Sequence, residues 1–165
     1  MKKIKYSIIG CGNVAGDYKN KQKIEGIYSH ADAFSRIKAF QPLACFDLYY
    51  KKALKFKKKW GFENAFSDLN ILNKLNNELI IVSTNTSSHY SILNKILKIK
   101  NKPKLVLCEK PLTANRKQCL EIYKGFKKKK ITLVVNFHRR WDETIHKIKK
   151  DIQNNLYGIS KLPRS

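Results

Sequence analysis

The sequence predicts an α/β protein with a Rossmann-like, doubly wound parallel sheet and helices on both faces. Three observations support this prediction. Short runs rich in β-branched residues recur along the chain, and they are apolar at successive positions, as in strands covered on both faces. Amphipathic helical patterns separate these runs. A glycine-rich turn, in the sequence IIGCGNVAG, follows the first run directly.

Five strands are expected, and a sixth has a weaker pattern. The first, IKYSII, leads into the glycine turn. Because strands that alternate with helices form right-handed βαβ units, their order in the chain predicts a parallel sheet. The predicted strands are 4–9, 42–47, 79–83, 104–108 and 131–135, with the weaker candidate at 63–66.

Helical spacing of apolar residues marks the segments between the strands. In SHYSILNKILKIK, for example, Leu93, Ile96 and Leu97 share one face. The polar, lysine-rich segment 17–29 delays the helix that should follow the first strand. The predicted helices lie around 30–40, 48–59, 68–76, 88–99, 114–128 and 141–154.

Length and composition indicate one folded domain with a short extension. A chain of 165 residues can bury a core, and its hydrophobic fraction of 42% is ordinary for a globular protein. We expect a dinucleotide-binding Rossmann domain over residues 1–140. Residues 141–165 are expected to form a linking helix and the start of a truncated C-terminal α/β domain.

Neither a membrane span nor a secretory signal is expected. The apolar runs are far shorter than the roughly 20 residues that cross a bilayer, and the N-terminal one is shorter than the about 7–15 residues of a signal peptide. The four cysteines show no C-x-x-C spacing and no histidine at ligand spacing. We therefore expect free thiols in the cytoplasm, with no disulfide and no metal site.

The formal net charge of +23 raises a nucleic-acid hypothesis. Only five of the 35 basic residues are arginines, which are the usual readers of bases and phosphates. The lysines are spread over almost every segment, and no zinc-finger, helix-turn-helix or RNP pattern is present. Solvated helix faces therefore explain the charge better than a dedicated nucleic-acid surface, which stays as an alternative.

The segment after the first strand has the pattern G-x-G-x-x-A. Gly10 permits a tight turn, Gly12 lets the backbone approach a pyrophosphate, and the small Ala15 allows close packing of strand and helix. Asn13 and Val14 complete this turn. All five residues are therefore predicted to bind a dinucleotide cofactor.

Asp47 closes the second predicted strand. A carboxylate there accepts from a ribose 2′-hydroxyl and repels a 2′-phosphate, which favours NAD over NADP. Asp47 lies 32 residues after Ala15, against about 20 in the usual spacing, and segment 17–29 accounts for the excess. The alternative is that Asp47 only caps the helix expected from residue 48. We favour the ribose contact because position and motif agree.

Four segments, in this order and at these separations, resemble the Gfo/Idh/MocA family, which is related to glucose–fructose oxidoreductase and inositol 2-dehydrogenase. The segments are IIGCGNVAG, ACFD, VSTNTSSHYSI and LVLCEKPLTAN. The resemblance covers the chain from residue 4 to about residue 160. It implies hydride transfer between NAD(H) and a sugar, nucleotide sugar or polyol.

The E-K-P sequence at residues 109–111 is the most specific part of this resemblance. It implies that Lys110 is the catalytic residue, which lies by the nicotinamide and also meets the substrate. It implies further that Glu109 contacts the cofactor side, and that Pro111 shapes the turn and is a cofactor contact with them. The position suits this role, because ligands bind at the carboxyl ends of strands and a lysine can accept a hydroxyl proton. The alternative is an exposed ion pair of Glu109 and Lys110.

Two further loops enter through the same resemblance. In STNTSSHY it implies that Ser83, Thr84 and Asn85 contact the cofactor, although Asn85 stands where the family commonly has proline. His89 is either a cofactor contact or a helix N-terminal residue, and both interpretations stay open. In NFHRR the resemblance implies that Arg139 or Arg140 meets the substrate. Both could instead be surface charges at the start of the next helix.

Full-length members of the family add a C-terminal α/β domain that carries most of the substrate pocket. We therefore expect this chain to bind the cofactor without turning over substrate, because hydride transfer needs the substrate held against the nicotinamide. The exposed apolar face of helix 141–154 could lead to self-association. Two other functions stay as alternatives: a non-catalytic dinucleotide-binding or redox-sensing protein, and a basic nucleic-acid-binding protein.

Overall fold

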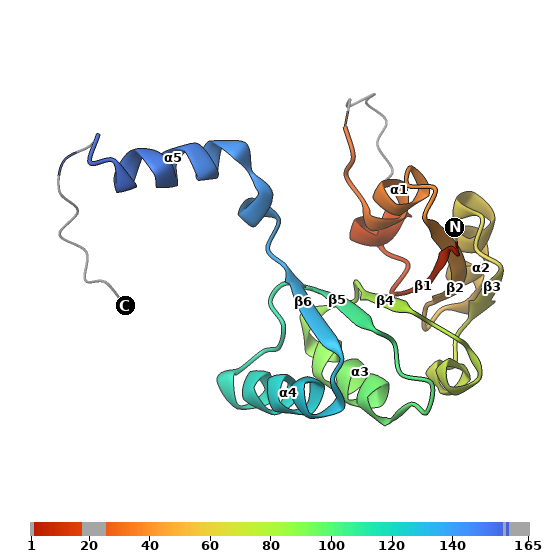
Figure 1. The fold of residues 1–165 in the computed structure, drawn as a ribbon. Coiled ribbons are helices and arrows are strands. Elements are labelled where there is room, and N and C mark those ends of the chain that lie inside the picture. Colours follow the sequence, from red (N-terminus) through yellow and green to blue (C-terminus); the bar gives the residue numbers. More distant parts are fainter. Residues whose placement is uncertain (1, 18–25, 157, 159–165) are drawn as a thin grey trace. The chain divides into compact units, whose positions relative to one another are not determined.

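Six parallel strands form one sheet in the order β3-β2-β1-β4-β5-β6, which confirms the predicted fold class (Figure 1). The computed structural model describes residues 2–17, 26–156 and 158. The chain divides into two units, residues 1–135 and 136–165. The strands are β1 (Ile4–Ile9), β2 (Phe40–Phe46), β3 (Asn64–Phe66), β4 (Leu79–Val82), β5 (Leu105–Glu109) and β6 (Thr132–Asn136).

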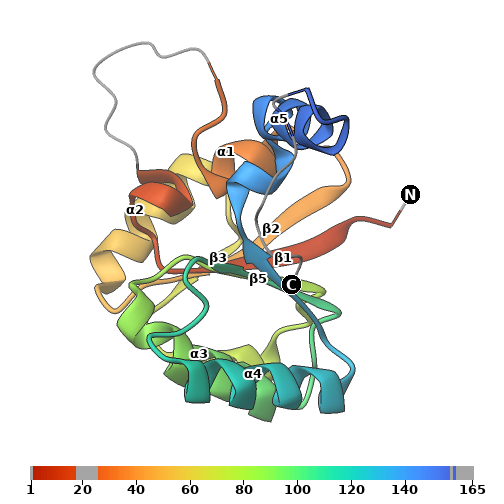
Figure 2. The ribbon, with the colours of Figure 1, turned by 90° about the vertical axis from the view of Figure 1, so that its left-hand side faces the viewer.

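The helices of the first unit cover both faces of the sheet. Those of one face, α1 and α2, lie on the opposite side from α3 and α4, as two views show (Figures 1 and 2). The helical elements of this unit are η1 (Asn13–Asp17), α1 (His30–Ser35), α2 (Tyr50–Trp60), η2 (Leu69–Lys74), α3 (Thr86–Lys98) and α4 (Arg116–Lys129).

Alternate residues of the strands enter two separate apolar layers. In β4, Ile80 and Val82 pack with residues of α3 and α4, whereas Leu79 and Ile81 pack with residues of α1 and α2. All four side chains are buried. This explains why the strand reads as a continuous apolar run, since a helix layer covers each face.

The start of β2 differs from its prediction. Helix α1 ends at Ser35 instead of residue 40, and β2 begins at Phe40 instead of residue 42. Phe40 pairs with Ile4, and its ring packs against Phe34 with ring centroids 4.6 Å apart. The register with β1 then shifts after Pro42, so this strand accommodates a proline, which has no N–H to donate, at an irregular position.

Two other predicted helices also differ. The segment around 68–76 forms the 3₁₀ helix η2, and the Asp68 side chain accepts a hydrogen bond from Asn70 N at 2.8 Å. The helix predicted from residue 88 begins two residues earlier, at Thr86. The weak strand candidate at 63–66 is confirmed as β3. Residues 18–25 of the lysine-rich segment lie outside the described residues.

The second unit contains η3 (His138–Trp141) and α5 (Glu143–Gln153). Helix α5 starts later than predicted because Asp142 caps it, accepting hydrogen bonds from Thr144 N and Ile145 N. Its apolar residues are exposed within the described chain, and Trp141 is 75% exposed. Residues 157 and 159–165, where the start of the C-terminal domain was expected, lie outside the described residues.

Ionisation of the buried Tyr6 hydroxyl is expected to lower the stability of the first unit at alkaline pH. Its ring is 1% exposed among the rings of Phe34, Phe40 and Phe62, and burial raises the pKa of Tyr6 to about 12 from 10.0. A raised pKa means that this contribution to stability is complete below pH 10 and is lost as the pH rises through 12. We expect the unaltered chain to lose about 2–3 kcal/mol more than Tyr6→Phe over this interval.

Urea unfolding from pH 9 to about pH 12 measures this difference. Lysine deprotonation affects both proteins equally, so only the gap between the two curves reports Tyr6. Parallel curves would show that the Tyr6 hydroxyl ionises without cost in the folded chain.

Candidate functional site

A cleft with a volume of about 570 Å³ lies at the carboxyl ends of β1, β2 and β4. This is the edge at which open α/β sheets bind ligands, and the volume is in the range of small-molecule sites. The first turns of α3 contribute Ser87, Ser88 and Ser91 to its wall. Of the residues predicted to bind the cofactor, those that line the cleft are Gly10, Gly12, Asp47, Ser83, Thr84 and Asn85.

Hydrogen bonds to the two neighbouring strands hold the glycine turn. Gly10 N donates to Phe46 O at 2.8 Å, and Ser83 Oγ donates to Gly10 O at 2.9 Å. Gly10 has φ +92°, a backbone conformation that a side chain disfavours. A Cβ added at Gly12 would meet nothing within 4 Å, so the backbone there is open to a ligand.

A single helical turn, which was not predicted, follows the glycine motif. Gly16 N and Asp17 N both donate to Gly12 O at 3.0 Å, and this π-helical turn is η1. Ala15 is fully buried in the layer with α1 and α2, whereas Asn13 and Val14 are exposed. These last three predicted residues belong to the turn and do not line the cleft.

Asp47 connects the end of β2 to the glycine turn. Its Oδ2 accepts a hydrogen bond from Cys11 N at 3.0 Å, and its Oδ1 accepts one from Tyr49 N at 3.0 Å. Lys52 Nζ lies 3.6 Å from Oδ2. Helix α2 begins at Tyr50 with Tyr49 as its N-cap, so Asp47 is not the capping residue that the alternative required. Each carboxylate oxygen retains a lone pair for a further donor.

The loop after β4 is held by hydrogen bonds to the end of β1 and by one with the start of α3. Ser83 Oγ donates to the carbonyls of Ile9 and Gly10, and Ser88 Oγ donates to Thr84 Oγ1 at 2.8 Å. Asn85 is the N-cap of α3 and is exposed. The loop therefore turns the N-terminus of α3 towards the cleft, an arrangement that favours anionic ligands.

His89 is the fourth residue of α3, which agrees with the interpretation of a helix N-terminal residue. Its side chain is 1% exposed, and its ring nitrogens lie 3.0 Å from Pro111 O and 3.0 Å from Thr84 O. It does not line the cleft. The ring thus lies between the loop after β4 and the E-K-P turn.

The E-K-P turn follows β5, and its three residues do not line the cleft. Glu109 Oε1 lies 2.8 Å from Nε2 of His30 in α1, and Glu109 Oε2 accepts a hydrogen bond from the backbone N of Lys110 at 3.3 Å. The Lys110 side chain is exposed, and the Lys110–Pro111 peptide bond is cis. Among the described residues, the side chains of Glu109 and Lys110 therefore do not form the ion pair of the alternative interpretation.

Arg139 and Arg140 belong to η3 in the second unit, and both are exposed. His146 Nε2 lies 2.6 Å from Arg140 O within this unit. Their role at a substrate stays a prediction.

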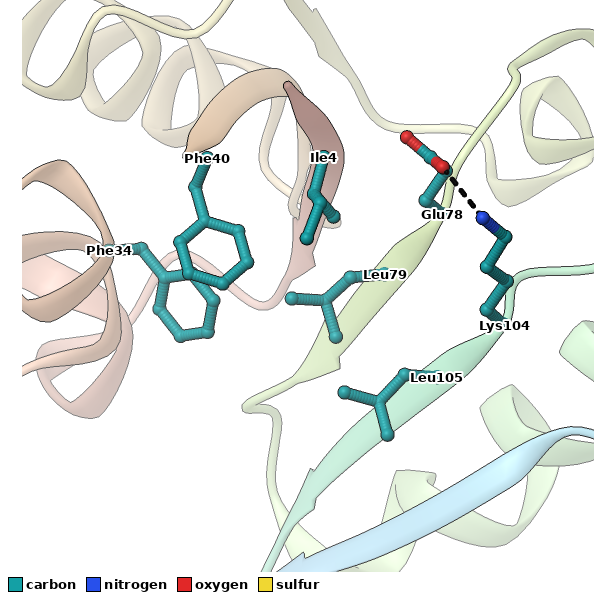
Figure 3. Close-up of a pocket in the computed structure, with 7 residues that line it drawn as sticks. All are labelled: Ile4, Phe34, Phe40, Glu78, Leu79, Lys104 and Leu105. Atoms are coloured by element: carbon teal, nitrogen blue, oxygen red, sulfur yellow. Dashed lines mark hydrogen bonds and ion pairs between the residues drawn. The ribbon is translucent and has the colours of Figure 1, made fainter. Parts of the chain in front are cut away.

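A second hollow, of about 250 Å³, lies at the amino ends of the strands (Figure 3). Phe34, Phe40 and Leu79 form part of its apolar wall, and Glu78 and Lys104 pair beside it at 3.1 Å. None of the residues predicted to bind cofactor or substrate lines it. The cleft at the opposite edge therefore remains the candidate site.

The cysteines and acids suggest no other chemistry in the described part of the chain. All four cysteines are free, and burial raises the pKa of the Cys108 thiol to about 12. Contact with the Cys45 thiol, and then burial, raise the pKa of Cys11 as well. Among the described residues, no three His, Cys, Asp or Glu side chains gather as metal ligands, and no helix has the length and apolarity of a membrane span.

The sequence prediction missed Lys52, which lines the cleft, and His30, which contacts the E-K-P turn. Lys52 is the third residue of α2, and its short separation from Asp47 in the sequence was the available indication. His30 lies beyond the lysine-rich segment, and only the fold brings it to Glu109. The serines at the start of α3 were visible in the sequence STNTSSHYS but had been assigned no role.

The strand order, the glycine turn and the cleft define a dinucleotide-binding domain of the Rossmann type. A family model described as "Oxidoreductase family, NAD-binding Rossmann fold" matches residues 4–137. The chain belongs to this family, Gfo/Idh/MocA, which confirms the resemblance found in its sequence.

Several known proteins are similar to this chain, and each matches it over less than half of its own length. Myo-inositol 2-dehydrogenase of Thermotoga maritima is 28% identical over 130 residues, which are 78% of this chain and 38% of that protein. The WlbA dehydrogenase of Chromobacterium violaceum, in complex with NADH and UDP-GlcNAcA, has a TM-score of 0.78 and 19% identity, covering 94% of this chain and 41% of that one.

A 3-ketoreductase of Actinomadura kijaniata, in complex with TDP-benzene and NADP, also has a TM-score of 0.78. The two chains are 18% identical, and the match covers 95% of this chain and 45% of the ketoreductase. At these identities the likeness to solved structures shows the fold. The chain spans about two fifths of the length of the relatives that it matches.

Proposed function

We propose that this chain is the NAD(H)-binding part of an oxidoreductase that transfers hydride to or from a sugar, nucleotide sugar or polyol. The observation that carries the proposal is the carboxylate of Asp47, bonded to Cys11 N inside the glycine turn. It joins the predicted ribose site to the predicted pyrophosphate site across two strands. Both therefore belong to one cleft.

The residues of the cleft suit the two ends of such a cofactor. Gly12 leaves room for a pyrophosphate, and Asp47 keeps lone pairs for ribose hydroxyl donors. Bound NAD would supply the hydride acceptor. Lys110, exposed on the turn after β5, is proposed to hold the substrate hydroxyl and accept its proton.

Turnover is proposed to need a substrate-holding region beyond this chain, because the relatives are more than twice its length. Arg139 and Arg140 are proposed to meet the oxygens of that substrate. The free thiols support the cytoplasm as the proposed compartment.

Calorimetric titration with NADH and NADPH tests the proposed cofactor. We expect NADH to bind about tenfold more tightly at physiological salt, because Asp47 repels a 2′-phosphate, and tenfold corresponds to about 1.4 kcal/mol. Asp47→Ser should remove this preference. Equal, salt-sensitive binding of both nucleotides would instead indicate attraction by the net charge alone.

Lys52 should moderate the same preference. Its ammonium is 3.6 Å from Asp47 Oδ2, so Lys52→Met removes positive charge beside the proposed 2′ position. We expect NADPH affinity to fall about threefold to tenfold further than NADH affinity, a typical range for one partly exposed charge. Lys55→Met removes the same charge from an exposed position of α2 and serves as the control. An identical effect of both variants would contradict the local role of Lys52.

A further inference from the structure

The residues on the two sides of Lys110 are held by histidines from other elements. Before it, Glu109 Oε1 lies 2.8 Å from His30 Nε2. After it, Pro111 O lies 3.0 Å from His89 Nδ1. Lys110 itself has an exposed side chain. The turn is therefore attached at both neighbours of its lysine, while the lysine points out.

The contact before Lys110 is largely removed from water. His30 is the first residue of α1 and is 9% exposed, and the Glu109 side chain is 13% exposed. Hydrogen bonds to charged groups stabilise a fold more than hydrogen bonds between neutral groups do, so loss of this contact is expected to loosen the end of β5. This pair attaches the end of β5 to α1 on one face of the sheet.

The contact after Lys110 reaches a second loop as well. His89 is 1% exposed, and its other ring nitrogen, Nε2, lies 3.0 Å from Thr84 O. Both partners are carbonyl oxygens, which only accept hydrogen bonds. A neutral ring therefore donates to one of them and a protonated ring to both. In either state the ring occupies the space between the two loops.

We propose that His30 and His89 are positioning residues, which hold the turn on both sides of Lys110 and so fix the direction of its side chain. According to this proposal, the two histidines act locally, on the turn that carries Lys110. A histidine that only filled the core would instead stabilise all parts of the domain to the same extent. Its catalytic meaning rests on the proposed function. The attachment of the turn does not, and it can be measured without any nucleotide.

Hydrogen exchange of the Lys110 and Leu112 amides, followed by NMR in the free chain, is the first test. His30→Phe and His89→Phe retain a ring and lose the ring nitrogens. We expect either variant to speed exchange at these amides about tenfold, the effect of one lost hydrogen bond to a buried group, with little change in β1 and β4. His30→Gln, whose amide can still donate to Glu109, should restore part of the protection.

Ile96→Val provides a matched control for loss of stability. Ile96 lies in α3 with His89 and is fully buried in the apolar layer, and it makes no hydrogen bond to the turn because its side chain is apolar. Unchanged exchange at Lys110 and Leu112 in the histidine variants would overturn the proposal. So would equal acceleration of these amides in Ile96→Val, because the effect would then be global.

The second test is a double-mutant cycle on NADH affinity, measured by fluorescence. In the unaltered chain we expect Lys110→Ala to weaken NADH binding about threefold to tenfold. In His89→Phe the same change should have little further effect, because the lysine is no longer directed. An equal effect in both backgrounds, or no effect of Lys110→Ala in the unaltered chain, would overturn the proposal. Absence of any NADH binding would instead refute the proposed function, and the exchange result would still stand.

Discussion

Replacing Gly10 by alanine is expected to destabilise the first unit by about 2–5 kcal/mol. Its φ of +92° disfavours any side chain, and an added Cβ would lie 2.7 Å from Thr84 Cγ2 and 2.8 Å from Ser83 O. The backbone cannot relax easily, because Gly10 is hydrogen-bonded to β2 on one side and to Ser83 on the other. The cost therefore combines a strained backbone with overpacking.

Urea unfolding measures this loss, and Gly61→Ala is the matched control. Gly61 also has a positive φ, +70°, but an added Cβ there would meet nothing within 4 Å. That variant should lose only the backbone contribution, about 1 kcal/mol. Equal losses at the two glycines would show that the close approach of β1 and β4 has no energetic importance.

Segments whose sequence pattern allows only one kind of structure were predictable from the sequence. The continuous apolar runs of β4 and β5 require cover on both faces, and the structure provides it with two helix layers. The start of β2 was not predictable in this way. Phe40 fits the end of a helix as well as a strand, and its packing against Phe34 and Tyr6 decides between them.

The residues of the site likewise include some that the sequence could predict and others that it could not. Gly10, Asp47 and Ser83 come together because the carboxyl ends of adjacent parallel strands share one edge. The contacts of His30 and His89 could not be predicted in this way, because their partners are distant in the sequence and only tertiary packing brings them together. The E-K-P turn entered the prediction through family resemblance, and its attachments became visible only in the fold.

Gly12→Val is expected to abolish NADH binding while leaving the domain folded. A Cβ at Gly12 would meet nothing within 4 Å, so the free chain has room for the new side chain. The stability should therefore change by no more than about 0.5 kcal/mol, as for an unconstrained surface substitution. In the cleft, however, the same side chain would fill the space that a pyrophosphate needs to approach the backbone.

We expect the NADH affinity of this variant to fall at least about 100-fold, or about 2.7 kcal/mol, in calorimetric titration. Gly12→Ala, with a smaller side chain, should bind with intermediate affinity. Retained binding in Gly12→Val would show that the pyrophosphate does not pass over the glycine turn, and the cofactor would then need another site. Loss of both binding and stability would leave the cleft unproved and would contradict the open space at Gly12. Loss of binding alone ties the nucleotide to this turn, because only a ligand that occupies the space above Gly12 can be excluded by it.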